Sequence, residues 1–574
     1  MSFISSVQRN TKPIFGLSSG CSNQMFQEKL PIYIIMKRTF YFRALITLFF
    51  FSAFAISQSQ TVQSPYPFND GLQRSTPEEQ GIASKTIATF FQQVAEKGYD
   101  VHGLMMLRHG KVIAEHWWAP YAPQYQHAMY SATKTFTGTA VGFAVQEGLL
   151  KIEDKVTSFF PDMLPATISP ELAKLTVKHL LTMSVGHAST QYAGSGDSQV
   201  RSFLAAKFAF QPGTSFAYNI TASHMLSHII TKVSGVSLYE FLKPRLLDPL
   251  GIEDVVWEMD NDGYNMGNGG THMKTSDLAK MGLFIMNKGK WNGKQLLNSA
   301  WIEAATKPQI LQHPEWTPEQ IENATEDGSQ GYGYQMWMGR RHTFRAIGGQ
   351  NQLIMMIPEY DFILVCHSQI GDEAGFNKLI YDMLPSMSNQ ALKADKSFDL
   401  NKAIAGYAIK RPFEGNSTAK VTMSTRRFQL DENPAGIRNV LFRFDASGNC
   451  YLTLITPTAI HNIPFGLDNW LIGMTDRSLS FARTVYPNAM GVTSVRTAGI
   501  CTWTATNQLS AYYLSMFNPG STETFKFTFE GDQLKMEIVA PPAQRRPQGA
   551  QGPQTATPPA EPKNLVFTGS KMKD

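Results

Sequence analysis

Cysteine and charged residues are both scarce in this chain. Four cysteines among 574 residues exclude a disulfide-stapled miniprotein, and their spacing matches no zinc motif. Charged residues make up 17% and hydrophobic residues 43%, a balance that excludes a disordered chain. Neither a collagen or coiled-coil pattern nor an internal repeat is evident. At roughly 100 to 200 residues per domain, two or three folded domains are expected.

Net charge is confined to the N-terminal segment. The chain has 51 Lys and Arg against 46 Asp and Glu. Six of these bases and one acid lie in residues 1–57, which leaves 45 of each in the remainder. The remainder is neutral, so composition gives no reason to expect a nucleic-acid partner.

The segment from Met36 has the pattern of a secretory signal peptide. A basic start is followed by an apolar stretch, residues 44–56, that is too short to span a bilayer, and then by the small and polar residues 57–59. We therefore expect export, to the periplasm or the medium, with Met36 as the true start. A non-cleaved membrane anchor is the alternative, and no lipobox cysteine decides between them. In an oxidising compartment Cys450 and Cys501 could pair, or both could be buried free thiols.

Residues 58–395 predict a domain of mixed helices and strands. A hairpin is expected around the turn 108–111, and helical periodicity marks 133–146, 223–233 and 275–286. Strand-like runs return at 352–357 and 362–367. Strands at both ends with helices between predict an α+β fold, with one antiparallel sheet, a separate helical cluster and a cleft between them.

Residues 396–540 predict an all-β domain. Phe442 and Phe444 alternate with other residues before a turn, and Phe525, Phe527 and Phe529 do the same. A small β-sandwich or barrel is the expected architecture. Residues 541–574 hold seven prolines and almost no large apolar side chains before Leu565, which predicts a disordered tail.

A candidate nucleophile lies at the start of the helix expected over 133–146. Ser131 and Lys134 are one turn apart, so the lysine amine can reach the serine hydroxyl. Serine needs a base, and a lysine buried in a cleft can lose its proton and supply one. The helix N-terminus would favour negative charge developing on an attacked carbonyl. Alone, Ser-x-x-Lys is weak evidence, because a serine N-cap on a solvated helix gives the same pattern.

Further landmarks follow in order along some 320 residues. Tyr218 and Asn219 lie just past a Pro-Gly turn and ahead of a helix. With them the sequence resembles the serine β-lactamase and penicillin-binding-protein family, especially its class C, esterase and 6-aminohexanoate-dimer-hydrolase branch. The matching segments are 130–134, 147–150 with Asp154, 176–183, Pro212-Gly213, Tyr218, Ser234-Gly235, 249–251, 275–279, 332–335 with Trp337, and 348–359.

The resemblance implies acyl transfer in two steps, with no cofactor. Ser131 would attack a carbonyl, Lys134 and Tyr218 would move its proton, and water would release the acyl-enzyme. Beside an ammonium group the pKa of Tyr218 should fall towards neutrality, so that the phenol can act as a base. The main-chain N–H groups of Ser131 and Gly349 would form the oxyanion hole.

Two departures from the family pattern point away from β-lactams. The expected Tyr-x-Asn is here Tyr218-Asn219-Ile220, with the amide one residue early. The third element, Lys-Thr-Gly or His-x-Gly, falls on Ala346-Ile347-Gly348 and has lost its basic residue. Alanine there, with Gln352 downstream, is similar to the esterase-like members, so an amide or ester is the expected substrate.

Other side chains give weaker signals. Trp337 could line an acyl pocket or simply pack in the core. Arg345, with Arg340, Arg341 and His342, could hold an acidic substrate group or belong to a solvated hairpin. His224 and His228 have a zinc-like spacing, but the glutamate of His-Glu-x-x-His is missing, so no metal is expected. The glycine-rich segment 267–270 lacks the Lys-Ser/Thr of a phosphate loop.

The expected function is therefore that of an exported serine hydrolase acting on a small amide, ester or peptide. Asn219, Ala346, Gly348, Gln352, Trp337 and Arg345 are the candidate substrate-binding residues. Membrane contact is expected only through an uncleaved signal segment. Two alternatives stay open: a binding protein that has lost turnover, and a peptidase acting on D-amino-acid peptides of the cell wall.

Overall fold

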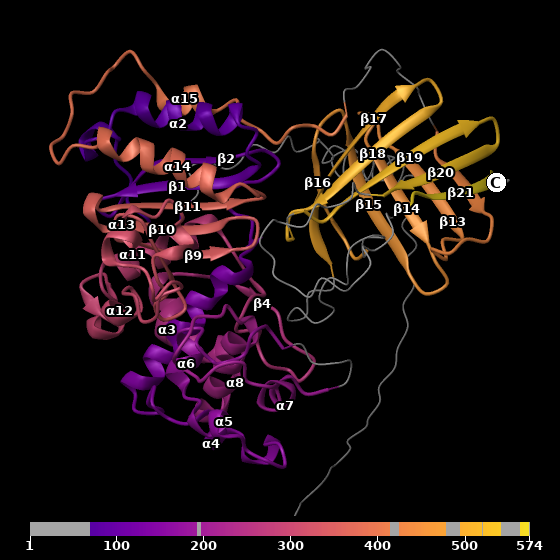
Figure 1. The fold of residues 1–574 in the computed structure, drawn as a ribbon. Coiled ribbons are helices and arrows are strands. Elements are labelled where there is room, and N and C mark those ends of the chain that lie inside the picture. Colours follow the sequence, from indigo (N-terminus) through magenta and orange to yellow (C-terminus); the bar gives the residue numbers. More distant parts are fainter. Residues whose placement is uncertain are drawn as a thin grey trace, which may run out of the picture. The chain divides into compact units, whose positions relative to one another are not determined.

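The computed structural model describes residues 69–191, 197–413, 424–477, 494–518, 520–540 and 563–572 (Figure 1). The signal segment expected within residues 1–57 lies outside these ranges. Among the helices they contain, none combines the length and the apolar character needed to cross a bilayer.

One antiparallel sheet of six strands forms the centre of the first domain. Its order is β2-β1-β11-β10-β9-β8, so strands from the two ends of the domain pair in the middle, as the sequence predicts. The strands are β1 (Val101–Arg108), β2 (Lys111–Trp117), β8 (Trp337–Gly339), β9 (Thr343–Gly348), β10 (Gln352–Ile357) and β11 (Phe362–Ser368).

The sheet is covered on both faces by helices (Figure 1). On β1, Leu104 and Met106 pack with α2 (Ser84–Glu96), α14 (Glu373–Met383) and α15 (Leu400–Ile404). Met105 and Leu107 point to the opposite side, into the core shared with α3 (Thr133–Gln146) and α11 (Thr275–Met286). Because alternate side chains of a strand face opposite ways, a strand that is apolar throughout must be covered twice.

The helical cluster extends the second of these cores. Its longest member, α8 (Ile220–Ser234), packs against α3. On α3, Gly142 also lies close to Trp301: a Cβ at this glycine would be 2.5 Å from the indole Nε1. The other elements are α4 (Val156–Phe159), α5 (Pro170–Lys174), α6 (Val177–Leu181), α7 (Gln199–Leu204), α9 (Leu238–Leu242), α10 (Asp248–Leu250), α12 (Ser299–Ala305), α13 (Pro318–Asn323) and the short turns η1 (Glu78–Gln80), η2 (Tyr130–Ala132), η3 (Pro161–Met163), η4 (Lys243–Leu247), η5 (Asp327–Ser329), η6 (Pro358–Tyr360) and η7 (Leu384–Ser386). Small sheets pair β3 (His127–Ala128), β5 (Thr271–Met273) and β4 (Val256–Trp257), and β6 (Lys290–Trp291) with β7 (Lys294–Gln295).

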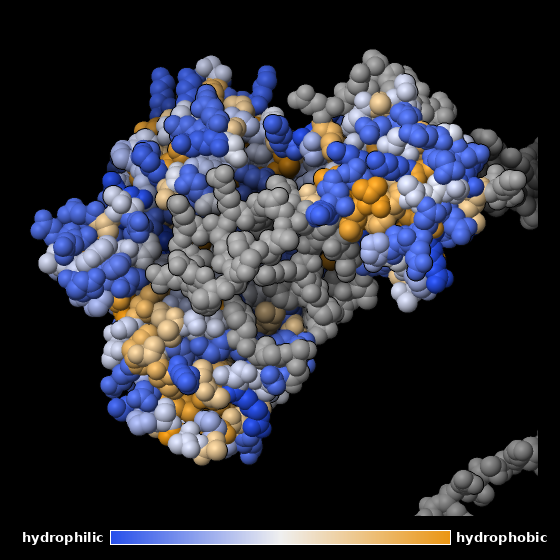
Figure 2. All heavy atoms as spheres, turned by 45° about the vertical axis from the view of Figure 1, so that its right-hand side comes forward, coloured by the Kyte–Doolittle hydropathy of each residue, from blue (hydrophilic) through white to orange (hydrophobic). Residues whose placement is uncertain are grey.

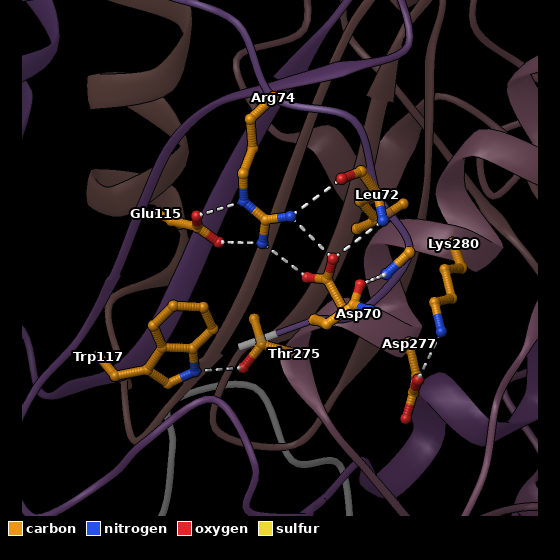
Figure 3. A network of polar contacts seen from close by, with 10 residues as sticks. Asp70, Leu72, Arg74, Glu115, Trp117, Thr275, Asp277 and Lys280 are labelled. Carbon is orange, nitrogen blue, oxygen red and sulfur yellow. Dashed lines mark hydrogen bonds and ion pairs between the residues drawn. The ribbon is translucent and has the colours of Figure 1, made fainter. Parts of the chain in front are cut away.

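Arg74 ties the segment before α2 to the edge of the sheet (Figure 3). Its guanidinium donates to both carboxylate oxygens of Glu115 on β2, at 2.8 and 3.0 Å, and to both of Asp70, at 2.9 and 2.8 Å. These paired hydrogen bonds to two carboxylates hold the pKa of Arg74 above its usual value. Next to them, the indole of Trp117 donates to Thr275, which joins β2 to α11.

The C-terminal domain is a closed β-barrel. Nine strands follow one another in the order β15-β14-β13-β12-β21-β20-β19-β18-β17, and pairing of β17 with β15 closes the ring, while β16 adds to β17. The strands are β12 (Arg426–Leu430), β13 (Asn439–Phe444), β14 (Cys450–Ile455), β15 (Ile460–Leu467), β16 (Leu471–Thr475), β17 (Val495–Ala505), β18 (Gln508–Ser515), β19 (Thr522–Glu530), β20 (Gln533–Val539) and β21 (Leu565–Lys571).

The last strand corrects the expectation of a disordered tail over 541–574. Residues 565–571 form β21, which pairs with both β12 and β20. Without β21, β12 and β20 would each have an unpaired edge, so the apolar run at Leu565 is the strand that completes the barrel. Residues 541–562, which hold the prolines, lie outside the described ranges.

Aromatic side chains fill the inside of the barrel. The alternating Phe442, Phe525, Phe527 and Phe529 point inward and contact one another. Cys450 and Cys501 are buried free thiols in this core, which settles the alternatives for this pair in the described part of the chain. The barrel is thus a packed core in which every second residue of a strand contributes.

Hydrophobic side chains interrupt the hydrophilic surface in several places on the face shown in Figure 2. Among the residues that the structure describes, the most exposed large hydrophobic side chains are those of Ile460, Val566 and Met474, all in barrel strands. Single exposed apolar side chains of this kind are common in folded proteins.

Candidate active site

Ser131 lies in the turn η2, directly before α3. Its neighbour Tyr130 has a φ of 45°, a left-handed conformation that costs a non-glycine residue about 1 kcal/mol or more. Ser131 is half-buried and lines a cavity of about 520 Å³. The serine is therefore held in a sharp turn at the entrance to a helix and faces an open space.

Lys134 lies one turn further along, as the spacing predicts. Its Nζ is 2.8 Å from the Oγ of Ser131 and donates to the main-chain oxygen of Asn268 at 2.7 Å. The side chain is 2% exposed, and burial lowers the pKa of its amine to about 7. A large fraction of the amine is thus uncharged near neutral pH and can accept the proton of the serine hydroxyl.

Tyr218 completes the group. Its hydroxyl hydrogen-bonds the Ser131 side chain, and the Nζ of Lys134 lies 5.2 Å from its ring centre. Burial raises the pKa of Tyr218 to about 12, which corrects the expectation that the pKa falls. That expectation assumed a neighbouring ammonium ion, but the buried amine itself tends to be neutral and offers little positive charge.

Trp337 packs against the ring of Tyr218. The two rings stack with centroids 5.5 Å apart, and Trp337 also contacts Phe216 and Tyr332. Among the described residues it does not line the cavity beside Ser131. Of the two roles left open for Trp337, the structure therefore favours core packing, which fixes the orientation of the tyrosine.

The end of β9 lies against the turn that carries Ser131. A Cβ on Gly348 would be 2.0 Å from the main-chain oxygen of Met129, whereas a Cβ on Gly349 would meet nothing nearer than Tyr130 at 3.8 Å. Only glycine fits at the first of these positions. This close approach brings the main chain of Gly349 beside the turn η2, as an oxyanion hole would need. Ala346 is buried two residues earlier in the strand.

Asn219 does not face the cavity, contrary to its prediction as a substrate-binding residue. Its side-chain oxygen accepts the main-chain N–H groups of Thr221 and Ala222, and its amide donates to Ser189 and Gln191. Asparagine is a preferred N-cap, and here it starts α8. The side chains that line the cavity at this point are those of Ile220 and Thr221.

Gln352 and Arg345 are also corrected. The fully buried Gln352 donates to the main-chain oxygens of Gly349 and Ser368 and accepts from the Ser368 N–H, so its hydrogen bonds hold the β9–β10 turn against β11. Arg345 is buried with its Nη1 3.2 Å from the carboxylate of Asp327. Both side chains interact with other residues of the fold, and a sequence pattern alone does not reveal such partners.

The glycine-rich segment 267–270 contributes a contact that the sequence analysis missed. It supplies the Asn268 oxygen that holds Lys134, and a Cβ on Gly267 would lie 2.6 Å from the main chain of Ser223. Consecutive glycines indicate a close approach of the backbone, and that signal was present in the sequence. The same cavity is also lined by acidic side chains that no motif marked: Asp197, Glu258, Asp260 and Asp262.

One cluster has the composition of a metal site. The Nε2 atoms of His224 and His228 lie 2.8 and 3.2 Å from Oδ2 of Asp260. However, the Nδ1 of His224 accepts the main-chain N–H of Gly267, so its ring proton must be on Nε2 and points at Asp260. A ligating histidine needs a bare Nε2 and commonly donates from Nδ1. In this arrangement the three side chains form a hydrogen-bonded cluster.

Comparison with known proteins identifies the family. The β-lactamase family model matches residues 87–382, about half of the chain and all of the site described above. The chain belongs to the β-lactamase family. It is 22% identical to the 6-aminohexanoate-dimer hydrolase of Paenarthrobacter ureafaciens over 312 residues, which are 51% of this chain and 79% of that protein.

Other members match in part. The lovastatin esterase of Penicillium rubens is 28% identical over 150 residues, 22% of this chain and 37% of the esterase. The octameric penicillin-binding protein homologue from Pyrococcus abyssi is a solved structure that aligns with 79% of this chain and 97% of its own, at 17% identity and a TM-score of 0.41. The matched members thus include proteins named as a 6-aminohexanoate-dimer hydrolase and an esterase.

Proposed function

We propose that this chain hydrolyses an amide or ester bond of a small molecule through an acyl-enzyme on Ser131. One observation carries the proposal: a buried amine with a pKa near neutrality lies 2.8 Å from a serine hydroxyl that faces a cavity. A serine hydroxyl becomes a nucleophile only when a base takes its proton. Lys134 is that base.

In the first step the Oγ of Ser131 attacks the substrate carbonyl while its proton passes to Nζ of Lys134. The carbonyl π electrons move to the oxygen, and the main-chain N–H groups of Ser131 and Gly349 stabilise the resulting oxyanion. When the oxyanion collapses, the bond to the leaving group breaks and the leaving group takes a proton. Water then attacks the acyl-enzyme while Lys134 accepts a proton from it. The bond between the acyl carbon and Oγ breaks, Ser131 takes that proton back, and the acid is released.

Tyr218 acts as a proton donor in this scheme. Its pKa of about 12 keeps the phenol protonated at neutral pH. From its hydrogen bond with Ser131 it can deliver a proton to the leaving group and regain one from Lys134, so that a proton moves along the chain of three residues without a free phenolate.

The substrate is an amide or ester in preference to a β-lactam. The family position that carries a basic residue in β-lactamases is here the buried Ala346. No lysine or arginine is among the described side chains that line the cavity. A substrate carboxylate therefore finds no cation there to offset the loss of its hydration.

A fluorophosphonate probe tests the nucleophile. The proposal requires that intact-mass measurement find one adduct on the wild type and none on Ser131→Ala, with a p-nitrophenyl ester turned over only by the wild type. Thr133→Ser is a suitable control because it removes only a nearby buried methyl group, keeps the hydroxyl and leaves Ser131 in place. Failure of the wild type to react with the probe and with every ester would sink the proposal and favour the non-catalytic binding protein.

Peptides that end in D-Ala-D-Ala test the remaining alternative. Turnover of these peptides at a kcat/KM above that of the esters would favour a cell-wall peptidase.

We also propose that the chain is exported, on the strength of the basic and apolar pattern from Met36 to residue 59. Recovery of a protein from medium or periplasm whose N-terminus lies just after that segment would support export, and retention in the cytoplasm at full length would refute it.

A further inference from the structure

The cavity beside Ser131 has a one-sided charge. Four carboxyl groups line it, those of Asp197, Glu258, Asp260 and Asp262, and no lysine or arginine does so among the described residues. Acidic side chains alone are common on protein surfaces, so the states and partners of these groups decide whether they form a binding site.

Asp260 is fixed as a carboxylate. Its Oδ2 accepts from the Nε2–H groups of His224 and His228, and its Oδ1 accepts the main-chain N–H groups of Asp262 and Tyr264, at 3.0 and 2.8 Å. Burial alone would raise the pKa of Asp260, but these hydrogen bonds outweigh it and lower the pKa. The negative charge is therefore held in place beside the cavity and acts on a ligand through its electric field.

Glu258 has an unpartnered carboxyl oxygen. Burial raises the pKa of this carboxyl to about 8, so it is largely protonated in the empty cavity, and a nearby cation would favour its ionised form. The side chain is 2% exposed, and its Oε2 has no hydrogen-bond partner. Its Oε1 lies 3.5 Å from the Nε2 of His272. Leaving a buried carboxyl oxygen without a partner costs free energy. A donor group on a ligand would remove that cost.

Two of the nearby histidines, His228 and His272, do not neutralise this charge. Burial lowers the pKa of His272 to about 4, and burial, the largest effect, also lowers the pKa of His228. Both rings are uncharged at neutral pH. At the Ser131 end of the cavity, the basic group nearest the serine among the described residues is the amine of Lys134, which tends to be neutral there.

We propose that this cavity selects substrates that carry a primary ammonium group, held near Glu258 and Asp260 while the scissile carbonyl lies at Ser131. An ammonium ion brings N–H donors for the unpartnered Glu258 oxygen and a charge opposite to that of the lining carboxylates. The inference rests on the proposed hydrolysis and adds to it the chemical class of the substrate.

Two p-nitrophenyl esters of one shape test the selection. The trans-4-(aminomethyl)cyclohexanecarboxylate carries an ammonium group, and the trans-4-ethylcyclohexanecarboxylate replaces that group with a methyl. For the wild type we expect kcat/KM to favour the ammonium ester by about tenfold or more, as expected for one charge pair of moderate strength. The preference should fall as NaCl rises from about 0.05 to 0.5 M, because salt screens it.

Charge-removing variants locate the selectivity. Asp260→Asn and Asp262→Asn should each reduce the preference, measured as the ratio of the kcat/KM values of the two esters, several-fold. Asp262 is exposed, so its variant is not at risk of misfolding. Asp532→Asn, at an exposed aspartate in the turn between β19 and β20, is the matched control and should leave the preference intact.

Three results would overturn the inference. The first is equal kcat/KM for the two esters in the wild type, and the second is an equal loss for both esters in Asp260→Asn and Asp262→Asn. The third is inhibition by EDTA that Zn²⁺ reverses, since that would assign His224, His228 and Asp260 to a metal ion. If neither ester is hydrolysed and the fluorophosphonate probe does not label Ser131, the proposed hydrolysis itself fails, and the inference fails with it.

Discussion

The amine of Lys134 lies 5.2 Å from the ring centre of Tyr218, and both side chains reach the hydroxyl of Ser131 between them. Burial moves their pKa values apart, to about 7 for the amine and about 12 for the phenol. Such separation assigns opposite roles, because one group is ready to accept a proton and the other to donate one.

The first prediction concerns the pH dependence of activity. Since only the uncharged amine of Lys134 can accept the serine proton, kcat/KM should rise with pH and level off above about 7. No fall should follow below about pH 10, because Tyr218 stays protonated there. Rates with a neutral ester, measured from about pH 5 to 10, check this. A flat profile across pH 7 would refute Lys134 as the base.

A second prediction separates the basicity of Lys134 from its size. Lys134→Arg keeps a long cationic side chain that does not lose its proton, so activity should drop by about 10² to 10⁴. Lys134→Ala should lose a similar factor. If the arginine variant retains most of the kcat, then the amine serves as a fixed charge and the proposed proton transfer is wrong.

Removing the Lys134 amine should lower activity but raise stability at low pH. The folded-state pKa of about 7 lies below the ordinary 10.5, so the unfolded chain binds more protons between these values and the wild type gains stability as pH rises from 7 to 10.5. Lys134→Met avoids burying an ammonium ion and should melt at a higher temperature than the wild type near pH 6. The difference should shrink by pH 10. A lower Tm for the methionine variant at both pH values would contradict the burial argument.

Much of this arrangement could be predicted from the sequence because it is local. Ser131 and Lys134 are one helical turn apart, and the strand-like runs at both ends of the domain predict one antiparallel sheet. The roles of Asn219, Gln352 and Arg345 could not be read in the same way. Their partners, such as Ser368 for Gln352 and Asp327 for Arg345, are set by tertiary packing.

The pKa of Tyr218 could not be predicted from the sequence for a similar reason. The sequence indicates that a tyrosine and a lysine meet, but the sign of the pKa shift depends on how deeply both are buried. The strand Leu565–Lys571 is a further example, because a short apolar run after many prolines acquires its role only from the two barrel strands that it joins.

Asn219 gives a prediction that distinguishes a structural from a binding role. Asn219→Ala removes the N-cap of α8 and should lower the free energy of unfolding by about 1 kcal/mol, while KM for small esters stays close to that of the wild type. Asn219→Asp retains the capping oxygen and should recover most of the lost stability. Denaturant unfolding and steady-state kinetics of the two variants check both statements. A rise in KM with unchanged stability in Asn219→Ala would instead indicate that Asn219 binds substrate.

The neighbouring glycines at the end of β9 provide the last prediction as a matched pair. A methyl group on Gly348 would lie 2.0 Å from the Met129 oxygen, so Gly348→Ala must push the turn η2 away and displace Ser131. We expect a loss of kcat of about 10² or more, since small displacements of a nucleophile have effects of this size. Gly349→Ala adds the same methyl group where the nearest atom is 3.8 Å away and keeps its main-chain N–H. That variant should retain its Tm and most of its kcat. Comparable losses in the two variants would mean that β9 does not set the position of the nucleophile, and the oxyanion hole would then have to be sought elsewhere.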